Sequence, residues 1–187
     1  MNSKLQIISG KFRGRKLYLP PNARPTQQRA RAALFNMLAS GVVGTDGCIN
    51  VWDAFAGSGA FGIEFISRYP NAKVVFTDVA KESLDTIRRN LAMLGVGNSG
   101  TVVAGDAVAL GTRFGMNSDV VFVDAPYSDA DVARIFVANL TRVARPGTIL
   151  IWEQENEKSI NAPDGWGVLR DKKYGRARFL ILQRTTE

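Results

Sequence analysis

Residues 49–68 read INVWDAFAGSGAFGIEFISR, and this stretch decides the fold class. An apolar segment at 49–54 is followed by three glycines and then by a helix pattern that we expect to span 58–68. Glycines at such a turn let a ligand approach the backbone closely and leave the amides at the helix start free to bind it. The stretch therefore predicts the strand, turn and helix that open a doubly wound α/β sheet.

Strands and helices are expected to alternate along the rest of the chain. We predict strands at 73–77, 101–104, 119–123 and 148–153, helices at 80–94 and 129–140, and a final antiparallel pair at 166–173 and 177–184. Apolar runs such as VVF and DVVFV are typical of parallel strands covered on both faces. The expected fold is Rossmann-like, with a mostly parallel sheet and an antiparallel C-terminal edge.

The first 45 residues differ from the rest in pattern and in charge. Residues 5–20 alternate and turn at Gly10 and Gly14, which predicts a basic β-hairpin, and residues 26–40 follow a helix pattern. Residues 1–45 carry eight basic residues and no acid, whereas residues 46–169 carry ten basic and fifteen acidic ones. We therefore expect a segment at 1–45 that faces a polyanion and a core domain at 46–187, with a merely solvated basic surface as the alternative.

The composition excludes several classes of chemistry. The chain has no histidine, which rules out Ser-His-Asp hydrolysis, histidine zinc sites and a histidine general base, so we expect no metal. Its one cysteine, Cys48, cannot form an internal disulfide, and we expect it to be a small buried hydrophobe. We find no signal peptide or membrane-spanning run, and we expect a cytoplasmic protein, monomeric and without membrane contact.

Four acids follow predicted strands, namely Asp53, Asp78, Asp106 and Asp124, and parallel strand ends should bring them to one rim. Asp53 precedes the glycine loop, where an acid repels a pyrophosphate but suits the amino group and sulfonium of S-adenosylmethionine. Asp78 could accept the ribose hydroxyls, and Asp106 an adenine N–H. For any one of these acids, a helix N-cap is the alternative role.

The fourth strand ends in Asp124, Ala125, Pro126 and Tyr127. The carboxylate of Asp124 could accept one N–H of an exocyclic amine, and the carbonyl of Ala125, held extended before Pro126, could accept the other. Tyr127 could stack on the base. This corner could position an amine for methylation without a strong base, while a plain strand-ending turn is the alternative.

The corner resembles the Asp/Asn-Pro-Pro-Tyr motif of amino-directed nucleic-acid methyltransferases, and nearly the whole chain resembles the bacterial small-subunit ribosomal RNA guanine-N2 methyltransferases. The resemblance rests on IISGKFRGRKL, RPTQQRARAALFNML, DAFAGSGAFGIEFISR, TDVAKESLDTIRRNL and DKKYGRARFLIL. It implies a class I methyltransferase fold, S-adenosylmethionine as methyl donor, and a guanine of small-subunit RNA, naked or in an assembling subunit, as target. Ala125 replaces the family's first proline, Gln28 and Ala32 stand where Asp and Glu are expected, and Asp78 replaces a more usual Glu.

Three groups of candidate site residues follow. The catalytic corner comprises Asp124, Ala125, Pro126 and Tyr127. The cofactor site comprises Asp53, Phe55, Gly57, Gly59, Gly62, Asp78, Val79, Asp106 and Ala107. The RNA-binding residues are Lys11, Arg13, Arg15, Lys16, Arg24, Arg29 and Arg31, with Lys172, Lys173 and Arg176 near the C-terminus.

Other functions remain open on the sequence alone. The altered residues Gln28, Ala32 and Ala125 would also suit a non-catalytic RNA-binding or ribosome-assembly protein on a methyltransferase scaffold. The corner also serves amino methylation of DNA adenine, and a nicotinamide oxidoreductase is a third alternative. We assign Trp52, Trp152 and Trp166 to packing because they lie in or beside predicted strands.

Overall fold

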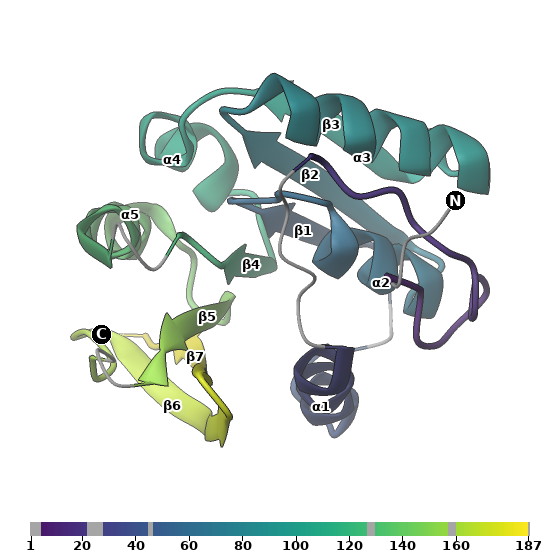
Figure 1. The fold of residues 1–187 in the computed structure, drawn as a ribbon. Helices are drawn as coiled ribbons and strands as arrows, with labels where there is room; N and C mark the ends of the chain where they lie inside the picture. Colours follow the sequence, from purple (N-terminus) through teal and green to yellow (C-terminus); the bar gives the residue numbers. More distant parts are fainter. Residues whose placement is uncertain (1–4, 22–27, 45–46, 127–129, 157–159, 187) are drawn as a thin grey trace.

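The structure of the protein is a computed structural model, of which we describe residues 5–21, 28–44, 47–126, 130–156 and 160–186 (Figure 1). Its helices are α1 Gln28–Ala39, α2 Ala60–Arg68, α3 Lys81–Leu94, the short 3₁₀ helix η1 Gly97–Ser99, α4 Ala107–Gly115 and α5 Ala130–Val143. Its strands are β1 Ile49–Asp53, β2 Ala72–Asp78, β3 Gly100–Ala104, β4 Val120–Val123, β5 Ile149–Glu155, β6 Trp166–Tyr174 and β7 Ala177–Arg184. Within these ranges no helix has the length and apolar character needed to cross a bilayer.

The strands form one seven-stranded sheet in the order β3-β2-β1-β4-β5-β7-β6. Strands β1 to β5 pair in parallel, and β7 pairs antiparallel with both β5 and β6. The predicted doubly wound sheet with an antiparallel C-terminal edge is therefore confirmed. The strand order reverses at β1, whose neighbours are β2 on one side and β4 on the other.

Helices cover both faces of the sheet (Figure 1). The core on one face combines α1, α2 and α3 with inward side chains such as Val51 and Phe76. The core on the other face combines α4 and α5 with Trp52, Trp152 and Trp166, all buried, which confirms that these tryptophans have a packing role. Burial on both faces explains why the parallel strands are continuously apolar.

Helix α4 was missed by the sequence analysis, and its glycines explain why. Gly111 and Gly115 are poor helix formers in a nine-residue segment. The structure requires a small residue at Gly115, since a Cβ there would lie 2.8 Å from a methyl carbon of Leu140 on α5. Close packing of α4 on α5 therefore overrides weak helix propensity.

The N-terminal segment is fastened to α2 by buried hydrogen bonds. The backbone N–H groups of Ile8 and Ser9 donate to the two carboxylate oxygens of Glu64, at 2.8 Å and 3.0 Å. The backbone N–H of Phe12 donates to Ser67 Oγ at 3.0 Å. These bonds use donors that a longer hairpin would need, so the predicted hairpin is reduced to a single antiparallel bridge between Gln6 and Lys16.

Residues on both sides of position 45 share one hydrophobic cluster. Leu5, Ile7 and Leu17 of the N-terminal segment, and Leu34 and Phe35 of α1, belong to the same core as the strands they cover.

Cys48 is exposed, so our expectation of a buried cysteine was wrong. The buried run of β1 begins only at Ile49, after the chain has left the surface.

Two glycines of the N-terminal turn give a matched test of how this segment docks. Gly10 and Gly14 both have a positive φ, of 81° and 80°, but a Cβ at Gly10 would overlap the carbonyl oxygen of Ser67 whereas a Cβ at Gly14 meets nothing within 4 Å. We expect Gly14→Ala to lower the free energy of unfolding by about 1–2 kcal/mol, the cost of the left-handed backbone. Gly10→Ala should lower the free energy of unfolding by about 1–3 kcal/mol more than Gly14→Ala does, because α2 or the N-terminal segment must move to make room for the added methyl group.

Chemical denaturation of both variants, followed by tryptophan fluorescence, measures this difference. Equal losses of stability in the two variants would contradict close docking of Gly10 on α2.

Candidate functional site

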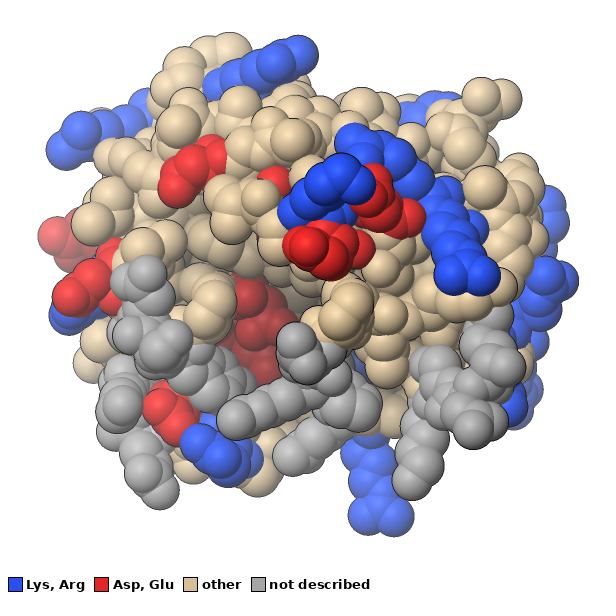
Figure 2. Space-filling model, turned by 45° about the horizontal axis from the view of Figure 1, so that its top comes forward, with Lys and Arg blue, Asp and Glu red and all other residues tan. Residues whose placement is uncertain are grey.

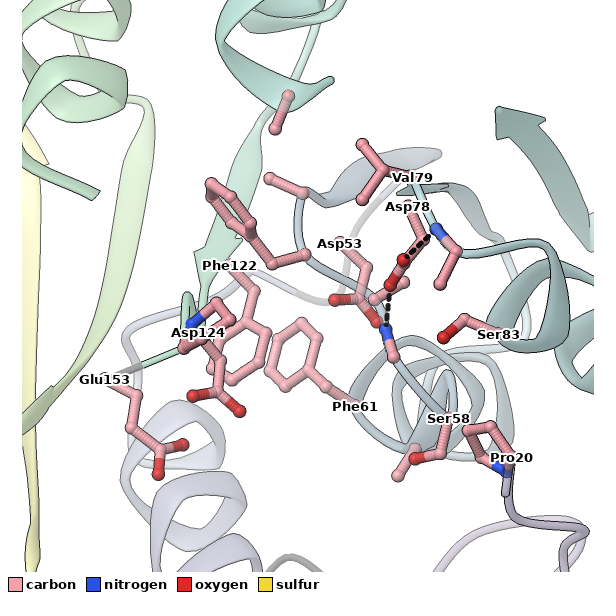
Figure 3. A pocket seen from close by; sticks show the side chains of 18 of the residues that line it. Pro20, Asp53, Ser58, Phe61, Asp78, Val79, Ser83, Phe122, Asp124 and Glu153 are labelled. Atoms are coloured by element: carbon pink, nitrogen blue, oxygen red, sulfur yellow. Dashed lines mark hydrogen bonds between the residues drawn. The ribbon is translucent and has the colours of Figure 1, made fainter. Parts of the chain in front are cut away.

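A cavity of about 760 Å³ opens at the carboxyl ends of the parallel strands. Its wall includes four acids, Asp53 and Asp78 at the last positions of β1 and β2, Asp106 shortly after β3 and Asp124 directly after β4. Figure 3 shows Asp53, Asp78 and Asp124 around this cavity. The four strand-end acids therefore lie around one cavity, as the sequence predicts. The wall also includes Pro20 and Pro21, which the N-terminal segment brings to this edge.

Within the glycine loop, only Gly57 lines the cavity. Its φ is 51°, and its backbone N–H donates to Asp78 Oδ2 at 2.8 Å. Gly59 is buried, with a φ of 73°. Gly62 lies inside α2, where a Cβ would overlap the ring of Phe76, so it allows close packing of helix on sheet. The structure thus separates one ligand-facing glycine from two structural ones.

Asp78 holds the loop as well as facing the cavity. Its Oδ2 accepts from Gly57, and its Oδ1 accepts from the backbone N–H of Ala80 at 2.8 Å. The next side chain, Val79, is 75% exposed and lines the cavity, as do Phe55 and Ala107. An exposed valine beside a carboxylate offers an apolar surface for a flat ring.

Asp53 is the most deeply buried acid of the cavity, with 1% of its surface exposed. Its Oδ2 accepts from the backbone N–H of Gly62 at 3.1 Å, whereas its Oδ1 is buried without a hydrogen-bond partner in the described part of the chain. Burial, with smaller contributions from Asp124 and Asp78, raises the pKa of Asp53 to about 7. A buried, unsatisfied carboxylate oxygen is costly, so this position fits a cationic donor such as an ammonium group.

Asp106 takes the alternative role that the sequence left open, because its Oδ1 accepts from the backbone N–H of Ala109 at 3.0 Å and caps α4. It also lines the cavity and is exposed, so its carboxyl group remains accessible from the cavity while one oxygen caps the helix. Helix capping and ligand contact are therefore compatible at this position.

The corner after β4 is described as far as Pro126. Asp124 and Pro126 line the cavity, and Ala125 between them is buried. Burial raises the pKa of Asp124 to about 6, so its carboxyl group is ionised at neutral pH. Tyr127 lies outside the described residues.

The cavity wall also contains residues that we did not single out from the sequence. Glu153 of β5 and Phe179 of β7 face the cavity near Asp124, and Phe61 of α2 stacks on Phe122 of β4 with ring centroids 3.9 Å apart. Glu153 had a usable signal, since it follows four apolar residues of a predicted strand just as Asp124 does.

The candidate RNA-binding residues fall into two environments. Those that are exposed are Lys11, Arg13, Arg15, Lys16, Arg29, Lys172, Lys173 and Arg176, the last of which donates to Glu155 at 2.9 Å. Arg31 is instead 3% exposed, lines the cavity and donates from Nη2 to the carbonyl of Gln6 at 2.6 Å. Its place on α1 turns Arg31 inward beside Glu64, so any contact with RNA would be made from the cavity, and its RNA-binding role stays a prediction. Arg24 lies outside the described residues.

Acidic side chains line the hollow of the molecule, whereas the outer surface carries both acidic and basic side chains. On the face in Figure 2 the surface is hollowed, and acidic side chains lie deep in the hollow, while the Lys and Arg side chains lie on the outer surface. Arg31 is the one basic residue among the described residues that line the cavity, against six acids: Asp53, Asp78, Glu82, Asp106, Asp124 and Glu153. The cavity therefore favours cationic or hydrogen-bond-donating ligand groups.

Comparisons with known proteins agree with this architecture. The family described as Conserved hypothetical protein 95 matches residues 5–183. Ribosomal RNA small subunit methyltransferase D of Escherichia coli strain K12 is 33% identical, covering 100% of this chain and 93% of that protein. Its Buchnera aphidicola (strain APS, Acyrthosiphon pisum) counterpart is 32% identical, covering 91% of this chain and 88% of that protein.

A solved structure is similar over the same length. "Putative methyltransferase yhhF from Escherichia coli" superposes with a TM-score of 0.84 at 30% identity, covering 98% of this chain and 99% of that chain. Sequence and structure thus agree from end to end, and the chain belongs to the Conserved hypothetical protein 95 family, among relatives that include the ribosomal RNA small subunit methyltransferase D proteins.

Proposed function

We propose that the protein transfers a methyl group from S-adenosylmethionine to the exocyclic N2 amine of a guanine in small-subunit ribosomal RNA. The observation that carries this proposal is the position of Asp124 and Pro126 in the same cavity as the partly unsatisfied carboxyl group of Asp53. In this proposal the methyl donor and the target amine bind in one cavity. The names of the full-length relatives support ribosomal RNA as the substrate.

The donor half of the cavity fits the chemical groups of S-adenosylmethionine. Asp53 Oδ1 would accept from the cationic amino group, Asp78 from the ribose, and Asp106 from the adenine amine, with Val79 against the ring. The bound donor supplies a sulfonium-activated methyl group. The residues of the chain bind and orient it, and Gly57 lets it approach the backbone.

The corner residues would orient the acceptor amine. Asp124 and the carbonyl of Ala125 would accept its two N–H groups, which directs the nitrogen lone pair toward the methyl group. Phe61 and Phe122 form an apolar wall beside Asp124 (Figure 3), and such a wall excludes water and strengthens these hydrogen bonds. The catalytic contribution is positioning and desolvation, which needs no histidine.

The basic residues of the ends would bind the RNA backbone. Lys11, Arg13, Arg15 and Lys16 are exposed on the N-terminal turn, and Lys172 and Lys173 on β6. Phosphate binding by such residues is independent of sequence and weakens with salt. In this proposal residues 1–45 and the C-terminal hairpin hold RNA while a single unstacked guanine enters the acidic cavity.

Removal of the Asp124 carboxylate tests the catalytic role. We expect Asp124→Ala to lower transfer of radiolabelled methyl groups to small-subunit RNA from cells lacking the gene by at least about 100-fold, since the amine loses its orientation. Calorimetry should show that S-adenosylmethionine still binds. Asp164→Ala, which removes an exposed acid from a loop outside the cavity, is the matched control and should keep wild-type activity.

Mapping of the methylated nucleoside in RNA from cells with and without the gene identifies the product. A gene-dependent N2-methylguanine supports the proposal. Cofactor binding without transfer to naked RNA or assembled particles would instead indicate an RNA-binding or assembly protein, and transfer to adenine in DNA would indicate the other amino methyltransferase.

The raised pKa of Asp53 predicts that donor affinity depends on pH. A cationic ligand favours the ionised carboxyl group, so binding must remove the proton that Asp53, with a pKa of about 7, holds at lower pH. We expect the affinity for S-adenosylmethionine to rise as pH increases from about 6 to about 8, by at most about tenfold per unit below the pKa.

Calorimetry in buffers of different ionisation enthalpy measures both the affinity and the released proton. Asp53→Asn should bind the donor more weakly and lose most of the pH dependence. A wild-type affinity that is constant across this range would contradict the role of Asp53.

A further inference from the structure

Beside Asp124, where the target amine would bind, the cavity contains a second carboxyl group, that of Glu153. The pairing of β4 with β5 sets its position. Val123 of β4 pairs with Trp152 of β5, so the next residues, Asp124 and Glu153, are neighbours across the two strands. Residues paired in this way point to the same face of a parallel sheet. Both line the cavity, and in Figure 3 their carboxyl groups point into the same part of it.

We propose that Glu153 accepts a hydrogen bond from the N1–H of the target guanine and thereby selects guanine over adenine. This inference rests on the proposed function and assigns a specificity-determining residue to the same site. Asp124 and the Ala125 carbonyl orient the amine that receives the methyl group, while Glu153 accepts a hydrogen bond from the neighbouring N1–H.

The chemistry of the base edge matches two adjacent acceptors. Guanine presents the N1–H and the N2 amine side by side, and both are donors, whereas adenine presents an acceptor at N1. Adjacent strands lie about 4.8 Å apart, and the glutamate side chain is one methylene longer than aspartate, so acceptors from β4 and β5 can address neighbouring donors of one base. A carboxylate facing adenine N1 would place two acceptors against each other.

The surroundings of Glu153 make this discrimination strong. The residue is 8% exposed, and its register partner on β7, Phe179, is 1% exposed and also lines the cavity. In an environment of low polarity, a hydrogen bond to a charged acceptor is strengthened, and so is the repulsion between a carboxylate and the acceptor N1 of adenine. Because Glu153 is buried, its one hydrogen bond can discriminate between guanine and adenine as substrates.

The test uses 2-aminopurine, which keeps the amine at C2 but has an acceptor at N1. Small-subunit RNA is rebuilt by ligation with guanine or 2-aminopurine at the mapped nucleotide and is offered naked and reconstituted with ribosomal proteins. We expect the wild-type protein to prefer guanine by about 10- to 100-fold in kcat/KM. Glu153→Gln can donate from its amide to N1, so its preference should fall by about tenfold or more, with increased activity on 2-aminopurine RNA.

Two further variants control for charge and folding. Glu155→Gln makes the same change two residues along β5, at a residue that does not line the cavity, and should keep the wild-type preference ratio. Glu153→Asp keeps the charge but shortens the side chain by one methylene, so its preference for guanine should fall between those of the wild type and Glu153→Gln. Binding of S-adenosylmethionine by calorimetry shows that each variant is folded.

The outcomes separate this inference from the proposed function. If the wild-type protein methylates guanine but its preference over 2-aminopurine is close to one, or if Glu153→Gln keeps the wild-type ratio, Glu153 does not read N1. If the wild-type protein methylates neither RNA in either form, the proposed function fails, and the assignment of Glu153 fails with it.

Discussion

The parallel pairing of β1 with both β2 and β4 is the constraint on which the site depends. Asp53 ends β1 in register with Phe76 of β2 and Phe122 of β4. The chain therefore leaves these strands at one edge of the sheet, and the reversal of strand order at β1 leaves room for a ligand there. A one-residue change of register would turn Asp53 and Asp124 to the opposite face, so the apolar runs that fix the register also fix the chemistry.

The N-terminal segment forms part of the cavity wall because hydrogen bonds to α2 and α3 hold the segment in place. Glu64 is fully buried and accepts from Ile8 N–H, Ser9 N–H and the guanidinium of Arg68, the last at 2.7 Å. Asn90 of α3 adds a reciprocal pair of hydrogen bonds with the backbone of Tyr18. These contacts fix the path of the chain before it supplies Pro20 and Pro21 to the cavity wall. Basic side chains on the same segment are thereby carried close to the sheet without entering its core.

Sequence patterns predicted the sheet and the ring of acids because both follow from local rules. Apolar runs mark buried strands, and an acid at a strand end in parallel β-structure lies on the ligand edge. The patterns could not show that Arg31 turns inward, because that depends on how α1 packs, nor that Gly62 serves helix packing against Phe76. Glu153 was predictable in principle by the strand-end rule that found Asp124, but its pairing beside Asp124 required the register of β4 and β5.

Burial of the acids in the cavity lowers the stability of the protein at neutral pH, and a ligand with cationic or N–H groups would offset this loss. Burial raises the pKa of Asp53 to about 7 and that of Asp124 to about 6, above the ordinary carboxyl value of about 3.9. The stability contributed by these two groups is thus fully present below their ordinary values and is lost as pH rises through about 6 to 7. At neutral pH about half of Asp53 and most of Asp124 is charged in a poorly solvated space, where a cationic group and the N–H groups of a base would provide partners. The burial that raises these pKa values also makes the cavity discriminate between ligands. A phosphate or a hydrogen-bond acceptor would add to the unfavourable electrostatic energy of the buried carboxylates, whereas a cation or an N–H donor would lower it.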